Sequence, residues 1–324
     1  MLGNRRLLAM KNNILFKTNL LVSVILLVGF ALIATLSYRA NYNASLVKIK
    51  QVSSLASEGI YYRLSTLLTK PVNISQTMAH DSLLIKLLEE EGSRYQETAY
   101  QETIRKYLAT YKNKYAYDSV FLVSTATNNY YNFNGIDRNL ARGEAENVWY
   151  YNFLQSGEEY SLNIDNDEVA GAADKITLFV NCRIRDAAGQ VIGVVGVGVN
   201  IDYIKGLLQE YEKEYDVATY LINEKGEIEV SSLYNGHQTA DWFKVNDSEA
   251  IRSEVLEWKN GRTNWDIWMP GAVQNNEKSY LVVRYIPDLS WYLLVKQDTG
   301  ALLAELNEKM LQTVVLILLV ILLI

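Results

Sequence analysis

An uncharged run near the N-terminus, residues 18–38, constrains most strongly what this chain can fold into. Its 21 residues, TNLLVSVILLVGFALIATLSY, include no Asp, Glu, Lys, Arg or His. At about 1.5 Å per residue a helix of this length spans roughly 31 Å, which matches a bilayer hydrocarbon core of about 30 Å. A helix also pairs its backbone polar groups internally, as the lipid interior requires. The run therefore predicts a transmembrane helix at residues 18–38.

The residues that flank this run predict its orientation. The charges in residues 1–17 are all basic, at Arg5, Arg6, Lys11 and Lys17. We therefore expect residues 1–17 in the cytoplasm and the rest of the chain to begin outside. A cleaved signal peptide is the alternative, but its apolar region spans about 7–15 residues and ends in a small-residue cleavage site. The longer run here, with Tyr38 at its end, favours a retained helix.

The C-terminal residues form a second apolar run. Residues 310–324, MLQTVVLILLVILLI, carry no charge, and these 15 residues cover only about 22 Å as a helix. We expect residues 299–324 to be a helix entering a second transmembrane span that the sequence cuts short. A C-terminal anchor that stops there is the alternative. The sequence thus predicts a multi-pass protein of the plasma (inner) membrane with an extracytoplasmic body at residues 39–309.

Composition excludes several function classes. The net charge of −6 and the pI near 5.2 argue against nucleic acid as a partner. Cys182 is the single cysteine, so neither an intrachain disulfide nor a thiolate metal cluster is possible. His80 and His237 lie far apart in the sequence and offer little for a zinc site. We expect no cofactor, and the 23 tyrosines favour binding over catalysis.

Helical periodicity continues beyond the first membrane run. Apolar residues recur at spacings of three and four, at Leu46, Ile49, Val52, Ala56, Ile60, Leu64 and Leu67. We expect a long extracytoplasmic helix at residues 39–79, which Pro71 ends or kinks. Its stripe packs against its own domain, against a second copy of the chain, or against both, so a homodimer is expected. Further helices are expected at residues 74–91 and 94–115.

From Asp118 the period becomes that of strands. The pattern predicts a hairpin (119–124 and 129–133), a helix (146–156), a strand (159–165), a turn of small residues (170–174) and two long strands (175–184 and 190–199). Gly189 lies in the turn between the long strands, where φ becomes positive. Asn200 or Asp202 is expected to cap a helix at residues 203–214.

A second, smaller cycle follows. The pattern predicts strands at 217–223 and 227–232, a helix at 248–259, and strands at 263–269, 278–286 and 291–297. The last two strands are joined by Pro287-Asp288-Leu289-Ser290, which favours a type I turn.

This order of elements resembles the double Cache family, from residue 40 to residue 300. The most specific pieces are the helix bearing Trp149-Tyr150-Tyr151, the strand GVVGVGVNID (193–202) and the hairpin YIPDLSWYLLV (285–295). The family comprises tandem extracytoplasmic sensor modules of bacterial chemoreceptors, sensor histidine kinases and membrane-bound diguanylate cyclases. The resemblance implies an α/β (α+β) fold in which a long N-terminal helix precedes two PAS-like antiparallel-sheet modules. The membrane-distal module would span residues 80–202, and the membrane-proximal module residues 203–298.

Strand 175–184 carries the candidate ligand site, because its side chains alternate. Ile176, Leu178, Val180, Cys182 and Ile184 point one way, and Thr177, Phe179, Asn181 and Arg183 the other. The second set is either a solvated face or the floor of a pocket roofed by the helix with Trp149 and Tyr150. In the pocket interpretation, Arg183 binds a carboxylate, Asn181 donates and accepts, Asp165 holds an ammonium group, and Tyr131 adds a hydroxyl.

The amino-acid-binding version of the family carries an Arg two residues before the Trp-Tyr pair and an Asp late in the glycine-punctuated strand. Here those positions hold Asn147 and Gly198. The resemblance therefore leaves the ligand open. The glycines 193, 196 and 198 instead indicate close backbone approach by a ligand or by a neighbouring element.

Three functions follow as hypotheses. The first is a sensor that binds a small polar metabolite, carboxylate or amine and signals to a missing cytoplasmic output domain. A diguanylate cyclase or histidine kinase is favoured as that output, and a chemoreceptor is the alternative. The second is an extracytoplasmic enzyme, for which Asp165 and Asp167 are the only close acid pair near the site; we expect no catalysis by this chain. The third is a structural scaffold that binds another protein.

Overall fold

The computed structural model describes residues 2–166, 176–232, 240–260, 262–269 and 279–322. Two compact units can be distinguished. One contains residues 54–266 and 281–296, and the other contains residues 1–53, 267–280 and 297–324. The turn expected at residues 170–174, and also Asp167 and His237, lie outside the described residues.

The first element is one long helix, α1, Leu2–Ala79, which continues through Pro71 rather than ending there. Proline has no N–H, so the carbonyl of Leu67 loses its usual helical partner at this point. Members of the expected apolar stripe, including Ala56, Ile60 and Leu64, are buried. The stripe therefore packs against its own domain.

A six-stranded antiparallel sheet forms the larger α/β layer of the first unit. Its strands are β1 Ser119–Ser124, β2 Asn129–Asn132, β3 Gly135–Asn139, β4 Tyr160–Asn166, β5 Ile176–Arg185 and β6 Val191–Asn200, in the order β3-β2-β1-β6-β5-β4. The expected hairpins are present, and Gly189 has a φ of +81° in the turn between β5 and β6. β3 was not expected from the sequence.

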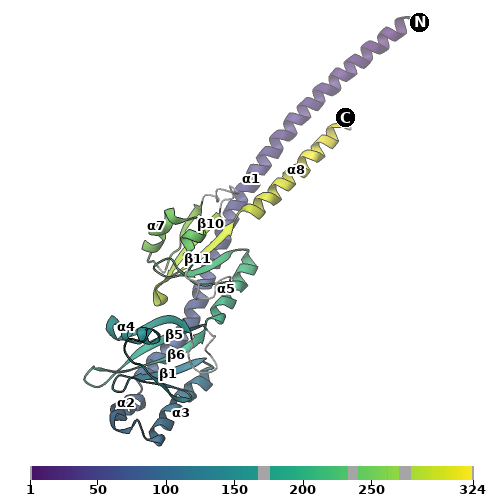
Figure 1. Cartoon of the computed structure of the whole chain (residues 1–324). Coiled ribbons are helices and arrows are strands. Elements are labelled where there is room, and N and C mark those ends of the chain that lie inside the picture. The colour runs from purple at the N-terminus through teal and green to yellow at the C-terminus, as the bar shows by residue number, and fades with distance from the viewer. Residues whose placement is uncertain (1, 167–175, 233–239, 261, 270–278, 323–324) are drawn as a thin grey trace. The chain divides into compact units, whose positions relative to one another are not determined.

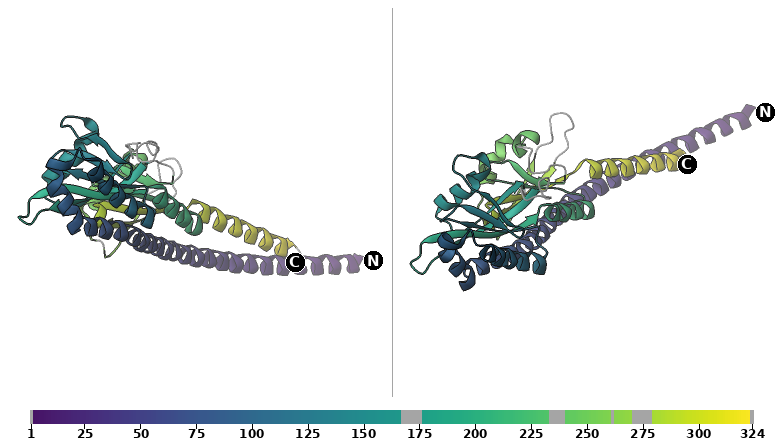
Figure 2. Two further views of the ribbon diagram at one scale, coloured as in Figure 1. Left: turned by 90° about the horizontal axis from the view of Figure 1, so that it is seen from below. Right: turned by 60° about the horizontal axis from the view of Figure 1, so that its bottom comes forward.

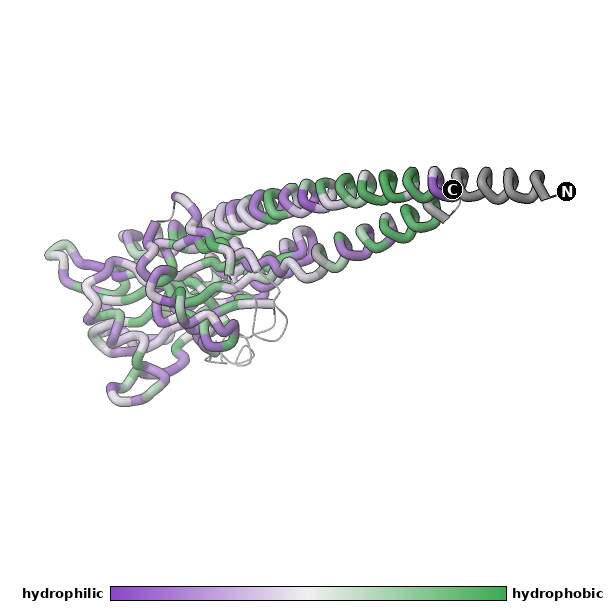
Figure 3. The backbone as a smooth tube through the Cα atoms, turned by 90° about the horizontal axis from the view of Figure 1, so that it is seen from above, coloured by the Kyte–Doolittle hydropathy of each residue, from purple (hydrophilic) through white to green (hydrophobic). Residues whose placement is uncertain are grey.

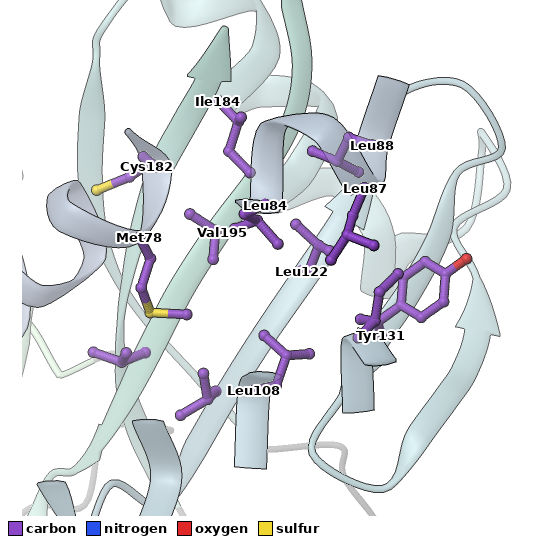
Figure 4. Close-up of a cluster of buried hydrophobic side chains, with 14 of the residues drawn as sticks. Met78, Leu84, Leu87, Leu88, Leu108, Leu122, Tyr131, Cys182, Ile184 and Val195 are labelled. Atoms are coloured by element: carbon purple, nitrogen blue, oxygen red, sulfur yellow. The ribbon is translucent and has the colours of Figure 1, made fainter. Parts of the chain in front are cut away.

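One face of this sheet is covered by helices. The end of α1, α2 (Ser82–Arg94) and α3 (Thr98–Tyr115) pack on it and bury a continuous apolar cluster. Figure 4 shows part of this cluster, in which Leu84 and Leu108 face strand residues such as Leu122 and Val195.

The opposite face carries a short helix. The 3₁₀ turn η1, Ala145–Asn147, leads into α4, Val148–Ser156, and Tyr150 and Phe153 of α4 pack against Phe121 and Val194 of the sheet. Figure 1 shows α4 on the other side of the sheet from α2 and α3.

Helix α5, Asp202–Tyr215, follows β6 after a single residue, Ile201. The N-cap residue is Ile201, which makes no side-chain capping bond, so neither Asn200 nor Asp202 caps the helix as expected. Oδ1 of Asn200 instead accepts the N–H of Asp202 at 2.8 Å in the turn before the helix.

The smaller sheet contains five strands in the order β8-β7-β11-β10-β9. The bounds are β7 Ala218–Ile222, β8 Ile228–Ser231, β9 Trp265–Met269, β10 Ser279–Ile286 and β11 Trp291–Asp298. Between them lie α6 Trp242–Val245, η2 Glu249–Ile251, α7 Arg252–Glu257 and η3 Pro287–Leu289. The strands match the sequence pattern, whereas α6 was not expected.

The last helix, α8, Gly300–Leu322, lies beside the N-terminal half of α1 (Figure 2), where the Tyr38 hydroxyl donates to Oδ1 of Asn307 at 3.2 Å. Apolar residues dominate α1 at residues 18–37 and α8 at residues 310–322 (Figure 3). The segment Lys17–Ala79 of α1 contains an 18-residue window of mean hydropathy 2.7 with no buried residue, which is long and apolar enough to cross a membrane.

Candidate functional site

The candidate site is the layer between α4 and the six-stranded sheet, and strand β5 supplies its floor. Val180, Cys182 and Ile184 lie in the cluster beneath α2 and α3, while Phe179 packs with the α4 cluster. The alternation expected for this strand is therefore confirmed. In the second set, Phe179 and Arg183 contact α4, and Thr177 and Asn181 are buried as well, so this is not a solvated face.

Arg183 fastens α4 to the strand beneath it. Its Nη2 donates to the backbone carbonyl of Phe153 at 2.6 Å, and its guanidinium lies 5.1 Å from the centre of the Phe153 ring. A cation at the C-terminal end of a helix also interacts favourably with the helix dipole. Arg183 is only 8% exposed, and its Nε has no hydrogen-bond partner among the described residues. One donor of this buried cation thus remains available.

Asn181 is the centre of a row of polar side chains. Its Nδ2 donates to Oδ1 of Asn163 at 2.6 Å and lies 3.5 Å from Oγ of Ser161. Within the described part of the chain its Oδ1 accepts no hydrogen bond, although Asn181 is only 2% exposed. Asp165 pairs with Thr177 across β4 and β5, so it lies on the same face as Asn163 and Ser161.

Sequence reasoning missed Asn163 and Ser161. They occupy alternate positions of the strand that ends at Asp165, so the period of two was the signal that links them to the site.

Trp149 and Tyr150 form the aromatic part of the layer. The Trp149 ring meets the Phe121 ring edge-on at a centroid distance of 5.8 Å, and the Tyr150 ring lies 5.8 Å from that of Trp149. Tyr150 is fully buried, burial raises the pKa of its hydroxyl, and this hydroxyl has no partner in the described residues. Sequence reasoning placed both residues correctly next to the sheet.

Tyr131 does not belong to this layer, so its assignment to the site is corrected. It lies opposite Leu122 in the β1–β2 hairpin and belongs to the cluster beneath α2 and α3 (Figure 4). Its hydroxyl donates to Oε1 of the buried Glu91 at 2.6 Å. The neighbouring Tyr130 faces α4 instead and stacks on Phe121 at 5.5 Å.

The glycines of β6 explain how the aromatic rings fit. A Cβ at Gly196 would lie 1.9 Å from the Val180 carbonyl oxygen and 2.7 Å from the Phe121 ring. A Cβ at Gly198 would lie 2.6 Å from Thr177 and 3.1 Å from the ring of Phe179. Side chains of neighbouring strands therefore rest directly on the β6 backbone, which is the close approach by a neighbouring element that the sequence indicated.

The layer combines aromatic side chains with buried polar atoms that have no hydrogen-bond partner among the described residues. Tyr150 Oη, Asn181 Oδ1 and Arg183 Nε belong to buried residues and have no partner among the residues described. Buried polar atoms are normally hydrogen-bonded, so these three atoms are candidates for contact with a ligand or with water. Three or more His, Cys, Asp or Glu side chains suited to a metal ion do not come together anywhere in the described ranges.

Comparison with known proteins identifies the fold. A family model described as Cache domain matches residues 39–306. The chain belongs to the Cache family. The double Cache resemblance seen in the sequence is thus confirmed, and so is the α/β fold with a long N-terminal helix and two antiparallel sheets.

Solved Cache domains of several receptors share this fold at low identity. The sensory domain of the Campylobacter jejuni chemoreceptor Tlp3 with isoleucine bound has a TM-score of 0.51 and 13% identity, covering 80% of this chain and 95% of that one. The ligand-binding domain of Mlp24 with asparagine has a TM-score of 0.51 and 10% identity, covering 80% and 98%. The extracellular domain of a histidine kinase, mmHK1S-Z2, has a TM-score of 0.50 and 12% identity, covering 84% and 99%.

Two positions of this Cache domain depart from the amino-acid-binding version of the family. Asn147 replaces the Arg and is 1% exposed, and its Nδ2 donates to the Ala141 carbonyl at 3.0 Å and to Glu144 Oε2 at 2.7 Å. Gly198 replaces the Asp and lies against Thr177 and Phe179. Neither position supplies a charge to the layer.

Proposed function

We propose that this chain is the ligand-sensing region of a membrane receptor and that its ligand binds in the layer beneath α4. The observation that carries this proposal is the set of buried polar atoms without partners among the described residues, at Tyr150, Asn181 and Arg183. They lie in the same layer as Trp149 and Phe121, whose rings supply apolar contact area. A binding site needs this combination of aromatic wall and few fixed polar groups.

The chemistry of the three atoms defines the ligand. Arg183 Nε is a donor and Asn181 Oδ1 is an acceptor, so the ligand must present both an acceptor and a donor. A carboxylate meets the first requirement, and an amine or hydroxyl meets the second. Tlp3 and Mlp24 were solved with isoleucine and asparagine bound. Because Asn147 and Gly198 replace the charged pair of the amino-acid version, we propose a small polar metabolite that Asn181, Arg183 and Asp165 hold.

The proposed location is extracytoplasmic, with the two apolar helices in the plasma membrane. The hydropathy of α1 and the exposed apolar side chains of α8, among them Leu311, Leu316 and Leu319, support this topology. The signal would pass along α1 and α8 to a cytoplasmic output, a diguanylate cyclase or histidine kinase in our proposal. A homodimer through α1 is supported by Leu55 and Tyr62, which are exposed and seven residues apart on one helix face.

Thermal-shift screening of the full chain in detergent micelles tests the binding proposal. The panel contains amino acids, organic acids and amines. At a concentration of about one hundred times its Kd, a ligand stabilises the folded protein by about 2.7 kcal/mol, which raises Tm by roughly 5–11 °C. Asn181→Leu, which removes both polar ends of the amide, should abolish the shift.

The matched control is Arg185→Met on the same strand. Arg185 pairs with the exposed Glu159 at the sheet edge, so this variant should keep the full shift. A panel without any hit would refute the proposal, and so would a hit that both variants retain. Light scattering of the same preparation measures the oligomeric state, and a monomer would contradict the proposed dimer.

A further inference from the structure

A cavity lies on the other side of the sheet from α4. It has a volume of about 200 Å³ and is lined by α1 at Leu67, Lys70 and Pro71, by residues 115–118 at the end of α3, and by Val199 and Tyr203. Val199 packs against the cluster beneath α2 and α3. No residue of α4 or β5 lines the cavity, so it is distinct from the proposed sensor site.

The walls are aromatic and carry one acidic group. The rings of Tyr115 and Tyr117 have a centroid distance of 5.9 Å, and Tyr203 of α5 also lines the cavity. Tyr117 is 8% exposed, and its hydroxyl has no hydrogen-bond partner among the described residues. The carboxylate of Asp118 accepts the N–H of Asn200 at 3.2 Å through Oδ2.

The ammonium group of one lysine already lies against an aromatic ring of this cavity. The ammonium of Lys70 lies 5.3 Å from the centre of the Tyr115 ring. Ring faces attract cations, and the exposed, flexible lysine side chain can be displaced into solvent. Lys70 therefore shows which charge this cavity accepts, and it also competes with any ligand of the same charge.

Two further cations lie near the cavity, and both are held by other groups. Lys112 Nζ donates to the backbone carbonyls of Tyr117 at 3.1 Å and Asp118 at 2.7 Å. Arg63, one helical turn before Leu67 in α1, pairs with Glu210 at 3.0 Å. Among the described residues that line the cavity, Asp118 is the one with an acidic side chain, so it is the group that can pair with a second cation.

We propose that this cavity binds a small organic ammonium ion with an apolar body, which displaces Lys70 from Tyr115. The ammonium group would lie between the Tyr115 ring and the Asp118 carboxylate. The apolar part would contact Leu67, Pro71 and Val199.

The cavity lies next to the contact between α1 and α5, so an occupant could affect how these two helices pack. Gly59 of α1 lies against the ring of Tyr211, since a Cβ there would be 2.6 Å from its hydroxyl. Arg63 and Glu210 link the same two helices. Leu67 of α1 and Tyr203 of α5 both line the cavity, so an occupant would contact both helices.

Calorimetric titration of the full chain in nonionic detergent tests the proposal. Benzyltrimethylammonium is the probe, and benzoate is its anionic counterpart. The cation should bind and benzoate should not. Asp118→Asn should weaken binding of the cation roughly tenfold, and Lys70→Gln should strengthen it severalfold because the competing ammonium is gone.

The two substitutions, Asp118→Asn and Lys70→Gln, are expected to change the affinity for the cation in opposite directions, so a general loss of structure cannot produce both results. Binding of benzoate that Lys70→Gln abolishes would identify an anion site and overturn the proposal, as would binding of neither probe. Lys70 is exposed, so its variant folds normally and its effect is not a consequence of unfolding. Asn181→Leu is the control for the layer beneath α4, and loss of cation binding in that variant would also overturn the proposal.

Discussion

Replacement of Gly196 by alanine should destabilise the domain strongly. The added Cβ would lie 1.9 Å from the carbonyl oxygen of Val180 on β5 and 2.7 Å from the Phe121 ring on β1. Carbon atoms make optimal contacts at about 3.5–4.0 Å, so this overlap exceeds what a side-chain rotation removes. Gly196 is flanked by hydrogen-bonded strands on both sides, and relief requires separation of β6 from a neighbour.

Overpacking of a tight interior costs about 1–3 kcal/mol, and we expect the upper end because one contact is with backbone. For a domain of this size a loss of about 3 kcal/mol lowers Tm by roughly 6–12 °C. Circular dichroism during thermal or urea unfolding measures the change. The matched control is Gly206→Ala in α5, where a Cβ meets nothing within 4 Å. That variant should be more stable by about 0.5–1 kcal/mol because alanine favours a helix. If the Gly196→Ala protein unfolds at the same temperature and urea concentration as the wild type, the register of β6 against β1 and β5 described above is refuted.

Three further predictions concern buried polar groups. Burial raises the pKa of Tyr117 to about 12, above the unfolded value of about 10. Its contribution to stability is therefore complete below about pH 10 and is lost as the pH rises towards 12, and Tyr117→Phe should flatten the fall of the unfolding free energy measured in urea between these values. Arg183→Met should cost about 2 kcal/mol in urea unfolding because the charged hydrogen bond to the Phe153 carbonyl is lost. Arg185→Met should cost less than about 1 kcal/mol, since its ion pair is exposed, and equal effects would contradict the role given to Arg183. Cys182 is 1% exposed and burial raises the pKa of its thiol to about 12, so a thiol reagent should modify it only after unfolding; rapid labelling of the native protein would show that β5 is accessible.

Strand periodicity in the sequence determined most of the candidate site. The alternation along β5 is strict, because one set of side chains is aliphatic and the other includes Asn181 and Arg183, and the structure follows it. The turn at Gly189 and the short connection into α5 at Asn200 carry local signals that need no tertiary information.

The assignment of Tyr131 was wrong because strand β1, SVFLVS, is apolar on both faces. The sequence of such a strand does not indicate which of its faces meets α4. The same holds for its partner β2, where a shift of one residue in the assumed alternation places Tyr131 instead of Tyr130 on the α4 face. Neither α6 nor β3 was predicted from the sequence, since Trp242–Val245 is a single turn of helix and Gly135–Asn139 is short and mostly polar. Pro71 did not end α1, because tertiary packing of the surrounding apolar residues outweighs one missing hydrogen bond.

The close fit of Phe121 and Phe179 on the β6 glycines has a mechanical consequence. The Phe121 and Phe179 rings lie directly against the main chain of β6, so no further side chain separates them from the strand. Strand β6 ends at Asn200 and α5 begins at Asp202, so only Ile201 connects the strand to the helix. A displacement of the aromatic rings that moves β6 would therefore reach the start of α5 through a single connecting residue.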